Sequence, residues 1–179
     1  EWLTVLRDRA AGWLADDPSA QVALMGDWNI APRDEDVWSM EFYADKSHVS
    51  PRERAAFAAI EAAGYVDVVR PHAPGPGVYT YWDYQRLRFQ KRQGMRIDFV
   101  LASPALAARV QGALIDRQER KGTGASDHAP VVVDLADWKG SDSAQPELNG
   151  ELLVAQTEQQ ARRRPRVPGG VGSEGPQLD

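Results

Sequence analysis

Two stretches of the chain place apolar residues at the three- or four-residue spacing of an amphipathic helix. The first covers residues 1–15, where apolar side chains share one helical face until Asp16-Asp17-Pro18 ends the pattern. The second opens at Ser50 with the start signal of a capping box, a Ser followed by Pro and Glu, and it stops at Gly64. The pattern therefore predicts two helices that each direct one face toward a core.

Between and after these helices, short apolar or alternating runs predict strands, because each run is too short for a helix and is bounded by turn residues. Such runs mixed with helices indicate a layered α/β domain. A loop is expected over Pro32–Asp45, and a short helix is expected from Ser103 to about Arg109. The predicted strands are Gln21–Met25, Val66–Val69, Val78–Tyr84, Met95–Leu101, Gly112–Ile115 and Pro130–Leu135.

Composition narrows the class of protein. Of the 179 residues, 42% are hydrophobic and 26% are charged, which is typical of one globular domain and excludes a wholly disordered chain. The absence of cysteine excludes disulfides, zinc–thiolate sites and cysteine nucleophiles. No apolar run is long enough to cross a bilayer and no signal peptide is visible, so we expect a cytoplasmic protein without a membrane partner.

The amino-acid composition changes after Trp138. Residues 140–179 contain no aromatic side chain, and 13 of these 40 residues are Gly, Pro or Ser. A segment of this composition buries too little apolar surface to fold by itself. We therefore expect a folded domain over residues 1–138 and a disordered tail over residues 139–179.

Acidic and amide side chains follow the first predicted strand. Asp27 and Asn29 lie in Gly26-Asp27-Trp28-Asn29, and residues two apart share a face in extended backbone. A carboxylate can accept a proton from water or bind a metal, and an amide can donate a hydrogen bond to a phosphate oxygen. The tetrapeptide taken alone favours a simpler interpretation, an Asx turn that closes the strand.

A further acidic residue, Asp98, interrupts an apolar strand, where an unpaired charge is costly. His128, in the loop segment Ser126-Asp127-His128, is a suitable partner. Held by Asp98, its imidazole would have a fixed tautomer and a stabilised charged form, suited to contacting a phosphate. Two alternatives stay open: an ion pair between Asp98 and Arg96, and an ordinary loop hydrogen bond at His128.

The set of carboxylate and amide side chains suggests a site for a hard cation. The three carboxylates Asp27, Asp98 and Asp127, with one amide and one histidine, suggest oxygen ligands, so Mg²⁺ or Mn²⁺ fits better than zinc or copper, because thiolates are absent and histidine is scarce. A divalent ion beside a carboxylate base and a histidine would suit phosphodiester hydrolysis. His48 and His72 lie in predicted loops without such a context and are interpreted as surface residues.

Residues 86–96 form a basic segment directly after the aromatic run Tyr79–Tyr84. Although the chain carries a net charge of −5, basic groups in one segment can neutralise phosphates, and aromatic rings can stack on bases. The alternative is a solvated loop that follows an aromatic core strand. The expected DNA-binding residues are Tyr81, Trp82, Arg86, Lys91, Arg92, Met95 and Arg96.

Four segments in this order resemble the exodeoxyribonuclease III family of DNA-repair nucleases, within the endonuclease/exonuclease/phosphatase superfamily. They are Gly26–Pro32, Tyr79–Tyr84, Gly94–Ser103 and Ser126–Pro130. The resemblance implies a two-sheet α/β sandwich and a Mg²⁺-dependent phosphodiesterase. Its expected partner is double-stranded DNA with 3′ ends or abasic sites.

The resemblance also implies roles for single residues. The predicted catalytic residues are Asp27, Asn29, Asp98 and His128. Asp27 would activate water or protonate the leaving group, Asn29 would hold the scissile phosphate or sit near the metal, and Asp98 would orient His128 against the phosphate. Asp127 would help at the metal, so the expected metal-binding residues are Asp27, Asn29 and Asp127. Tyr81 and Met95 fall where the family lines the pocket for an extruded abasic sugar.

Only the second half of the family domain has a counterpart in this sequence, and residues after Trp138 have none. The implied fold is therefore half of a sandwich, with the missing N-terminal half as a partner and a sheet face left uncovered. We expect the isolated chain to be poorly soluble or inactive. Two alternatives remain: a phosphatase or phosphodiesterase acting on lipid or small molecules, and a non-catalytic DNA-binding module.

Overall fold

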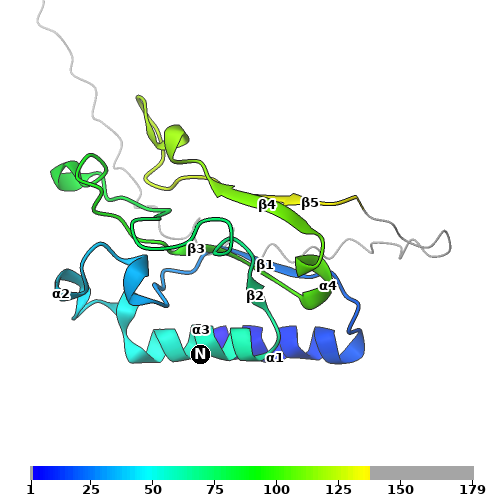
Figure 1. The fold of residues 1–179 in the computed structure, drawn as a ribbon. Helices are drawn as coiled ribbons and strands as arrows, with labels where there is room; N and C mark the ends of the chain where they lie inside the picture. The colour runs from blue at the N-terminus through cyan, green and yellow to red at the C-terminus, as the bar shows by residue number, and fades with distance from the viewer. Residues whose placement is uncertain (1, 138–179) are drawn as a thin grey trace, which may run out of the picture. The chain divides into compact units, whose positions relative to one another are not determined.

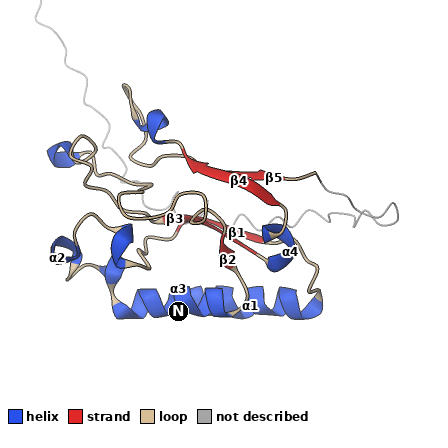
Figure 2. Cartoon of the chain, in the orientation of Figure 1, coloured by secondary structure: helices blue, strands red, loops and turns tan. Residues whose placement is uncertain are grey.

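The computed structural model describes residues 2–137, and the predicted disordered tail over residues 139–179 lies outside the described residues. Helices and strands are mixed along the chain, as the sequence predicts for the α/β class (Figures 1 and 2). No helix within residues 2–137 is long and apolar enough to cross a membrane. The helices are α1 Trp2–Asp16, α2 Met40–Tyr43, α3 Pro51–Ala62 and α4 Pro104–Ala107, and the strands are β1 Ala23–Asp27, β2 Val66–Asp67, β3 Asp98–Ala102, β4 Val110–Ile115 and β5 Val131–Leu135.

The two predicted long helices, α1 and α3, are confirmed, and they lie side by side along one face of the first sheet (Figure 1). Helix α3 begins as expected: Pro51 is its first residue, and the Ser50 side chain accepts a hydrogen bond from the Glu53 amide at 3.3 Å. The helices and the sheet enclose the main core, which contains Ala10, Leu24, Trp28, Ile30, Phe57, Ile60, Tyr65, Phe99 and Leu101.

The first sheet has the order β1-β3-β2 and is antiparallel throughout. Because side chains alternate across a strand, Leu24 and the pair Phe99 and Leu101 face the helices. The opposite face carries Ala23 and Val100, which pack near α4 and the second sheet, β4-β5. The α/β fold class expected from the sequence is therefore present, with two sheets and helices against the outer face of one.

Two predictions about the connecting segments are wrong. Val78–Tyr84 is not a strand: only Tyr81 forms bridges, one to Met95 and one to His128. Burial in this segment does not alternate, because Tyr79, Thr80 and Trp82 are all buried, so other elements cover it on both sides. The second error is the loop expected over Pro32–Asp45, which holds a short 3₁₀ helix and α2, whose N-cap is Ser39.

Candidate active site

The register of the first sheet brings two of the predicted catalytic acids together. Asp27, the last residue of β1, is paired directly with Asp98, the first residue of β3. Directly opposite residues of an antiparallel pair project to the same face, about 5 Å apart. Burial and the neighbouring Asp98 charge raise the pKa of the Asp27 carboxyl, although a hydrogen bond from the Asn29 amide acts in the opposite direction.

His128 completes this cluster from the loop before β5. Its Nδ1 lies 2.9 Å from Asp98 Oδ2, and its Nε2 lies 3.9 Å from Asp27 Oδ2. The hydrogen bond to Asp98 raises the pKa of the imidazole, against the effect of partial burial. The alternative partner for Asp98 is excluded, because the Arg96 guanidinium instead contacts Asp67 at 2.6 Å and 2.8 Å.

Asn29 reaches the same cluster by a different backbone path from the one expected. Its φ of 53° is left-handed rather than extended, a conformation that Asn tolerates better than most residues. The Asn29 amide nitrogen donates to Asp27 Oδ1 at 2.9 Å, and its side-chain amide donates to Asp27 Oδ2 at 3.1 Å. The Asx turn and the site are therefore the same feature, because the turn that closes β1 also turns the Asn29 amide onto Asp27.

Thr80 connects the strand that carries Asp98 to the loop that carries His128. Its buried hydroxyl oxygen accepts hydrogen bonds from the Ile97 and Asp98 amides, both at 3.1 Å. Its carbonyl oxygen accepts from the Ala129 amide at 2.7 Å. One side chain and one carbonyl thus fix both halves of the Asp98–His128 pair. No periodicity in the sequence marks Thr80, and the sequence analysis missed it.

The described residues do not assemble a complete metal site. Within residues 2–137, no group of three or more acidic or histidine side chains is placed to hold an ion. Asp27 and Asn29 are hydrogen-bonded to each other, and Asp127 is half-buried with its carbonyl accepting from the Trp82 amide at 2.9 Å. The oxygen donors suit Mg²⁺ in kind, but this arrangement alone does not provide enough ligands.

The predicted DNA-binding residues divide by exposure. Arg86, Lys91 and Arg92 are exposed in the segment between Tyr84 and Gly94. Arg96 and Trp82 are each only 1% exposed, which corrects their assignment as DNA contacts. Arg96 is held by its ion pair with Asp67, and Trp82 packs in a small core with Tyr79 and Ala129.

Tyr81 and Met95 line a cavity of about 350 Å³ that borders the cluster, together with Asn29 and His128. Tyr81 and Met95 therefore lie beside the proposed catalytic groups.

His48 lines the same cavity, so its interpretation as a surface residue is wrong. It is half-buried, and burial lowers the pKa of its imidazole. It lies in the 3₁₀ helix Ser47–Val49, directly before the N-cap of α3. The remaining lining residues are Phe42, Tyr43, Lys46, Asp83, Arg88 and Ile97.

The fold has two sheets, and two antiparallel strand ends in it carry carboxylates that an imidazole lies between. This fold and site indicate a hydrolase of phosphate esters. The chain belongs to the endonuclease/exonuclease/phosphatase family, whose match covers residues 3–128. It is 31% identical over 116 residues to an exodeoxyribonuclease from Bacillus subtilis, covering 64% of this chain and 44% of that protein. It is 30% identical over 121 residues to the DNA repair nuclease APEX1 of Danio rerio, covering 67% and 38%.

A solved structure supports the fold directly. The 3′ phosphatase NExo from Neisseria, bound to a product DNA hairpin, superposes with a TM-score of 0.70 at 35% identity, covering 76% of this chain and 52% of that one. The resemblance to the exodeoxyribonuclease III family and the fold class are thus confirmed. The chain spans less than half the length of the two curated relatives.

Proposed function

We propose that this chain forms part of a divalent-metal-dependent DNA-repair phosphodiesterase that acts at 3′ ends or abasic sites of double-stranded DNA. The observation that carries the proposal is the placement of His128 between Asp98 and Asp27, with Nδ1 2.9 Å from one carboxylate and Nε2 3.9 Å from the other. Relatives named as an exodeoxyribonuclease and as a DNA repair nuclease support DNA as the substrate.

The three groups divide the chemistry of phosphodiester hydrolysis between them. Asp98 holds the imidazolium of His128, which contacts a non-bridging phosphate oxygen and stabilises the charge that builds up there. Asp27 accepts the proton of the attacking water or donates one to the leaving sugar oxygen, and its raised pKa suits either transfer. The water oxygen bonds to phosphorus as the bond to the leaving oxygen breaks. Asn29 holds the scissile phosphate through its amide.

A bound Mg²⁺ or Mn²⁺ would neutralise charge on the phosphate during this reaction. In our proposal Asp27, Asn29 and Asp127 contribute ligands, and further ligands come from outside this chain. The carboxylate and amide oxygens of these residues are donors of the kind that Mg²⁺ binds in proteins.

DNA reaches the cluster along two surfaces in our proposal. The exposed side chains of Arg86, Lys91 and Arg92 contact phosphates of the duplex backbone. Tyr81 and Met95 line the cavity beside His128, which takes the group at the 3′ end or the abasic sugar.

The missing N-terminal half is the second partner that we propose. The chain covers 44% and 38% of the two curated relatives, so more than half of each lies outside the match. Strand residues Met25, Leu114 and Val132 are 63%, 47% and 40% exposed, which leaves apolar strand surface for another segment to cover. The chain alone is therefore proposed to be inactive.

The test compares the chain alone with a complete protein in which the proposed N-terminal half is joined before Glu1. Duplex DNA with a recessed 3′ end and duplex DNA with one abasic site are incubated with Mg²⁺ or with EDTA, and products are separated by length. We expect cleavage by the complete protein only, lost in EDTA and in Asp98→Asn. Hydrolysis of phospholipid headgroups without DNA cleavage, or metal-independent DNA binding without cleavage, would contradict the proposal.

A further inference from the structure

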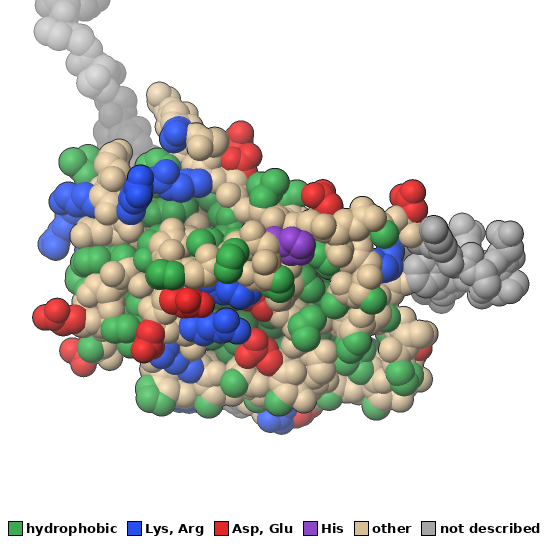
Figure 3. Space-filling view, viewed as in Figure 1, with side chains coloured by type: hydrophobic (Ala, Val, Ile, Leu, Met, Phe, Trp, Pro, Cys, Tyr) green, Lys and Arg blue, Asp and Glu red, His purple; other side chains and the backbone are tan. Residues whose placement is uncertain are grey.

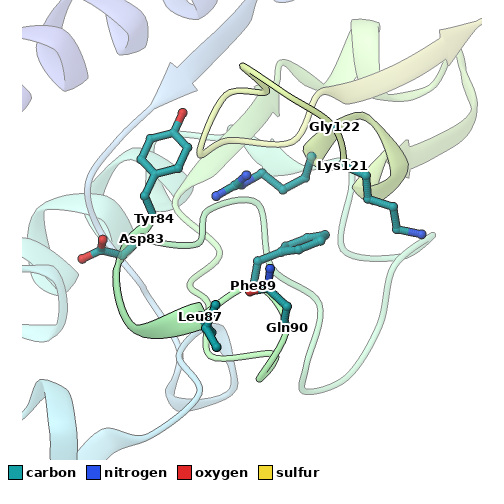
Figure 4. A pocket seen from close by; sticks show the side chains of 8 residues that line it. Asp83, Tyr84, Leu87, Phe89, Gln90, Lys121 and Gly122 are labelled. Atoms are coloured by element: carbon teal, nitrogen blue, oxygen red, sulfur yellow. The ribbon is translucent and has the colours of Figure 1, made fainter.

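A second cavity, of about 340 Å³, is lined in part by the segment that follows Trp82 (Figure 4). Its lining comes from two parts of the chain, residues 83–90 and residues 120–122. Of these residues only Asp83 also borders the cavity beside His128. Figure 4 shows Tyr84, Leu87 and Phe89 on one part of the wall and Lys121 and Gly122 on the other. None of these residues takes part in the proposed hydrolysis.

The guanidinium of Arg120 is the main cationic group that lines this cavity. The residue is only 8% exposed, and its Nη2 donates to the Trp82 carbonyl at 3.1 Å. It lies over the rings of Tyr84 and Phe89, at 4.7 Å and 5.2 Å from their centroids. Its Nε is buried and has no hydrogen-bond partner. These contacts are all with neutral groups, so among residues 2–137 the charge of Arg120 has no paired carboxylate.

The other buried arginines within residues 2–137 divide into two kinds. Arg70 and Arg96 are 8% and 1% exposed, and both contact carboxylates, namely Asp36 and Asp67. Arg88 is 8% exposed and resembles Arg120, because it lies over the rings of Trp38 and Phe42 and takes part in no ion pair among the described residues. Within residues 2–137, no carboxylate oxygen lies within 4.0 Å of the Arg120 side-chain nitrogens. A nearly buried cation without a carboxylate is costly unless an anion joins it.

The surroundings of the cavity favour an anionic ligand. Lys121 lines it and is exposed, and Arg117 lies over Phe89 at 4.3 Å from the ring centroid. Asp83 is the one carboxylate among the lining residues, and its Oδ1 is engaged by the Gln85 amide at 2.8 Å. Figure 3 shows Lys and Arg side chains gathered at the end of the molecule where this segment and the 3₁₀ helix Arg117–Arg120 lie in Figure 1.

Aromatic surface at the cavity adds a second requirement for the ligand. Tyr84 and Leu87 are each 62% exposed, and Leu87 follows Arg86 with both residues at left-handed φ values of 55° and 58°. Such backbone is uncommon for these residue types. An exposed tyrosine ring beside a cationic cavity suits a planar base attached to a phosphate.

We propose that this cavity is a second, non-catalytic phosphate-binding site for a nucleotide. Arg120 and Lys121 hold the phosphate, and the base lies against Tyr84. The site requires neither the Asp98–His128 pair nor a metal ion, so it goes beyond the proposed hydrolysis. The same chemistry is offered by a phosphate of a nucleic-acid strand and by a free nucleotide.

The first experiment uses inorganic phosphate as the probe. Thermal unfolding of the chain is followed by circular dichroism in EDTA, with phosphate or with chloride at equal ionic strength. A ligand that binds only the folded state raises the midpoint, and any general salting-out effect is the same in all variants. The matched control is Arg52→Met, an exposed arginine on α3. We expect phosphate to raise the unfolding midpoint of the wild type and of the control by the same amount. In Arg120→Met we expect a smaller rise, because phosphate binding at the cavity no longer contributes to it.

Loss of a charge-assisted hydrogen bond lowers affinity by about tenfold or more, and this is the expected effect of Arg120→Met. Because this variant removes packing as well as charge, Lys121→Met gives an independent measure at an exposed position, where we expect about threefold weaker phosphate binding. The inference is overturned if Lys121→Met binds phosphate as tightly as the wild type, or if a folded Arg120→Met gains the same rise in midpoint.

The second experiment distinguishes the two sources of the phosphate. Fluorescence anisotropy in EDTA compares a labelled single-stranded thymidine octamer with thymidine monophosphate as its competitor. Binding of the octamer more than about tenfold tighter than the mononucleotide, and weakened by Lys121→Met, assigns the site to a nucleic-acid strand. Equal affinities assign it to a free nucleotide. An octamer unaffected by Arg120→Lys and Lys121→Met, with a mononucleotide that does not compete, overturns the inference. Because no cleavage is measured, these results are independent of whether the proposed nuclease function is correct.

Discussion

The two faces of the β1–β3 strand pair have opposite properties. On the face toward α1 and α3, Leu24, Phe99 and Leu101 are 8%, 1% and 0% exposed. The face toward the second sheet carries Asp27 and Asp98 at the strand ends, and Met25 is 63% exposed. The same backbone therefore supports a dense apolar core on one side and the proposed chemistry on the other.

The difference follows from the two-residue alternation of a strand. Odd-numbered positions of β1 and even-numbered positions of β3 point to the site face, so the acids do not interrupt the core. The core face fixes the strand register, because a shift by one residue would turn Phe99 and Leu101 away from the helices. That register in turn sets Asp27 opposite Asp98. Packing on one face thus decides the geometry on the other.

The largest expected effect is on catalysis at the site face. In the complete protein, His128→Ala should lower DNA cleavage by about 10²–10⁴-fold, because the phosphate loses its charged partner. Gel-based rates on an abasic duplex measure this. His72→Ala, an exposed histidine outside the cluster, should leave the rate unchanged. A rate near that of the wild type in His128→Ala would refute the proposed role.

Stability should depend on the core face and not on the exposed position of the site face. Phe99→Ala removes a buried ring that packs on Phe57, and we expect it to cost about 3–5 kcal/mol of unfolding free energy. Met25→Ala, at an exposed position of the adjacent strand, should change the value by less than about 0.5 kcal/mol. Urea unfolding measures both. Equal losses would show that the two faces do not differ as the structure indicates.

Substitution of Thr80 tests whether its hydrogen bonds to strand β3 hold Asp98 in place for the site. Thr80→Val keeps the shape but removes the acceptor of the Ile97 and Asp98 amides, so we expect a loss of about 1–3 kcal/mol. Thr80→Ser retains the hydroxyl and should lose less. In the complete protein, Thr80→Val should also lower the cleavage rate more than it weakens DNA binding. A valine variant as stable and active as the serine variant would contradict this account.

The smallest expected effect is on the pH dependence of stability. The imidazole of His128, which faces Asp98, Asp27 and Asp127, has a pKa raised above its ordinary value of 6.5. A raised pKa means that the folded state binds the proton more tightly, so this stabilisation is complete below pH 6.5 and is lost as pH rises through the folded-state value. Urea midpoints between about pH 5 and about pH 9 should therefore fall in the wild type. Asp98→Asn should flatten this dependence, and an unchanged slope would contradict the assignment.

Much of the site could be predicted from residue types and their positions. A charge within the apolar strand at Asp98 requires a partner, and the choice of His128 over Arg96 is confirmed. The two long helices were predicted because their periodicity and start signals are local features. The prediction of a strand over Val78–Tyr84 was wrong, because the spacing of its aromatic residues resembles the two-residue alternation of a strand. In the structure the segment is instead buried by residues far along the chain, such as Met95 and His128.

The α/β class, the family and the residue types around Asp98 could be inferred from the amino-acid order, because propensity, patterning and motifs are local features of the chain. The register that sets Asp27 opposite Asp98, the burial of Trp82 and Arg96, and the placement of Arg120 over two rings beside a cavity could be learned from the folded chain alone. Exposure and pairing depend on which distant segments pack together, and that packing is a property of the whole fold.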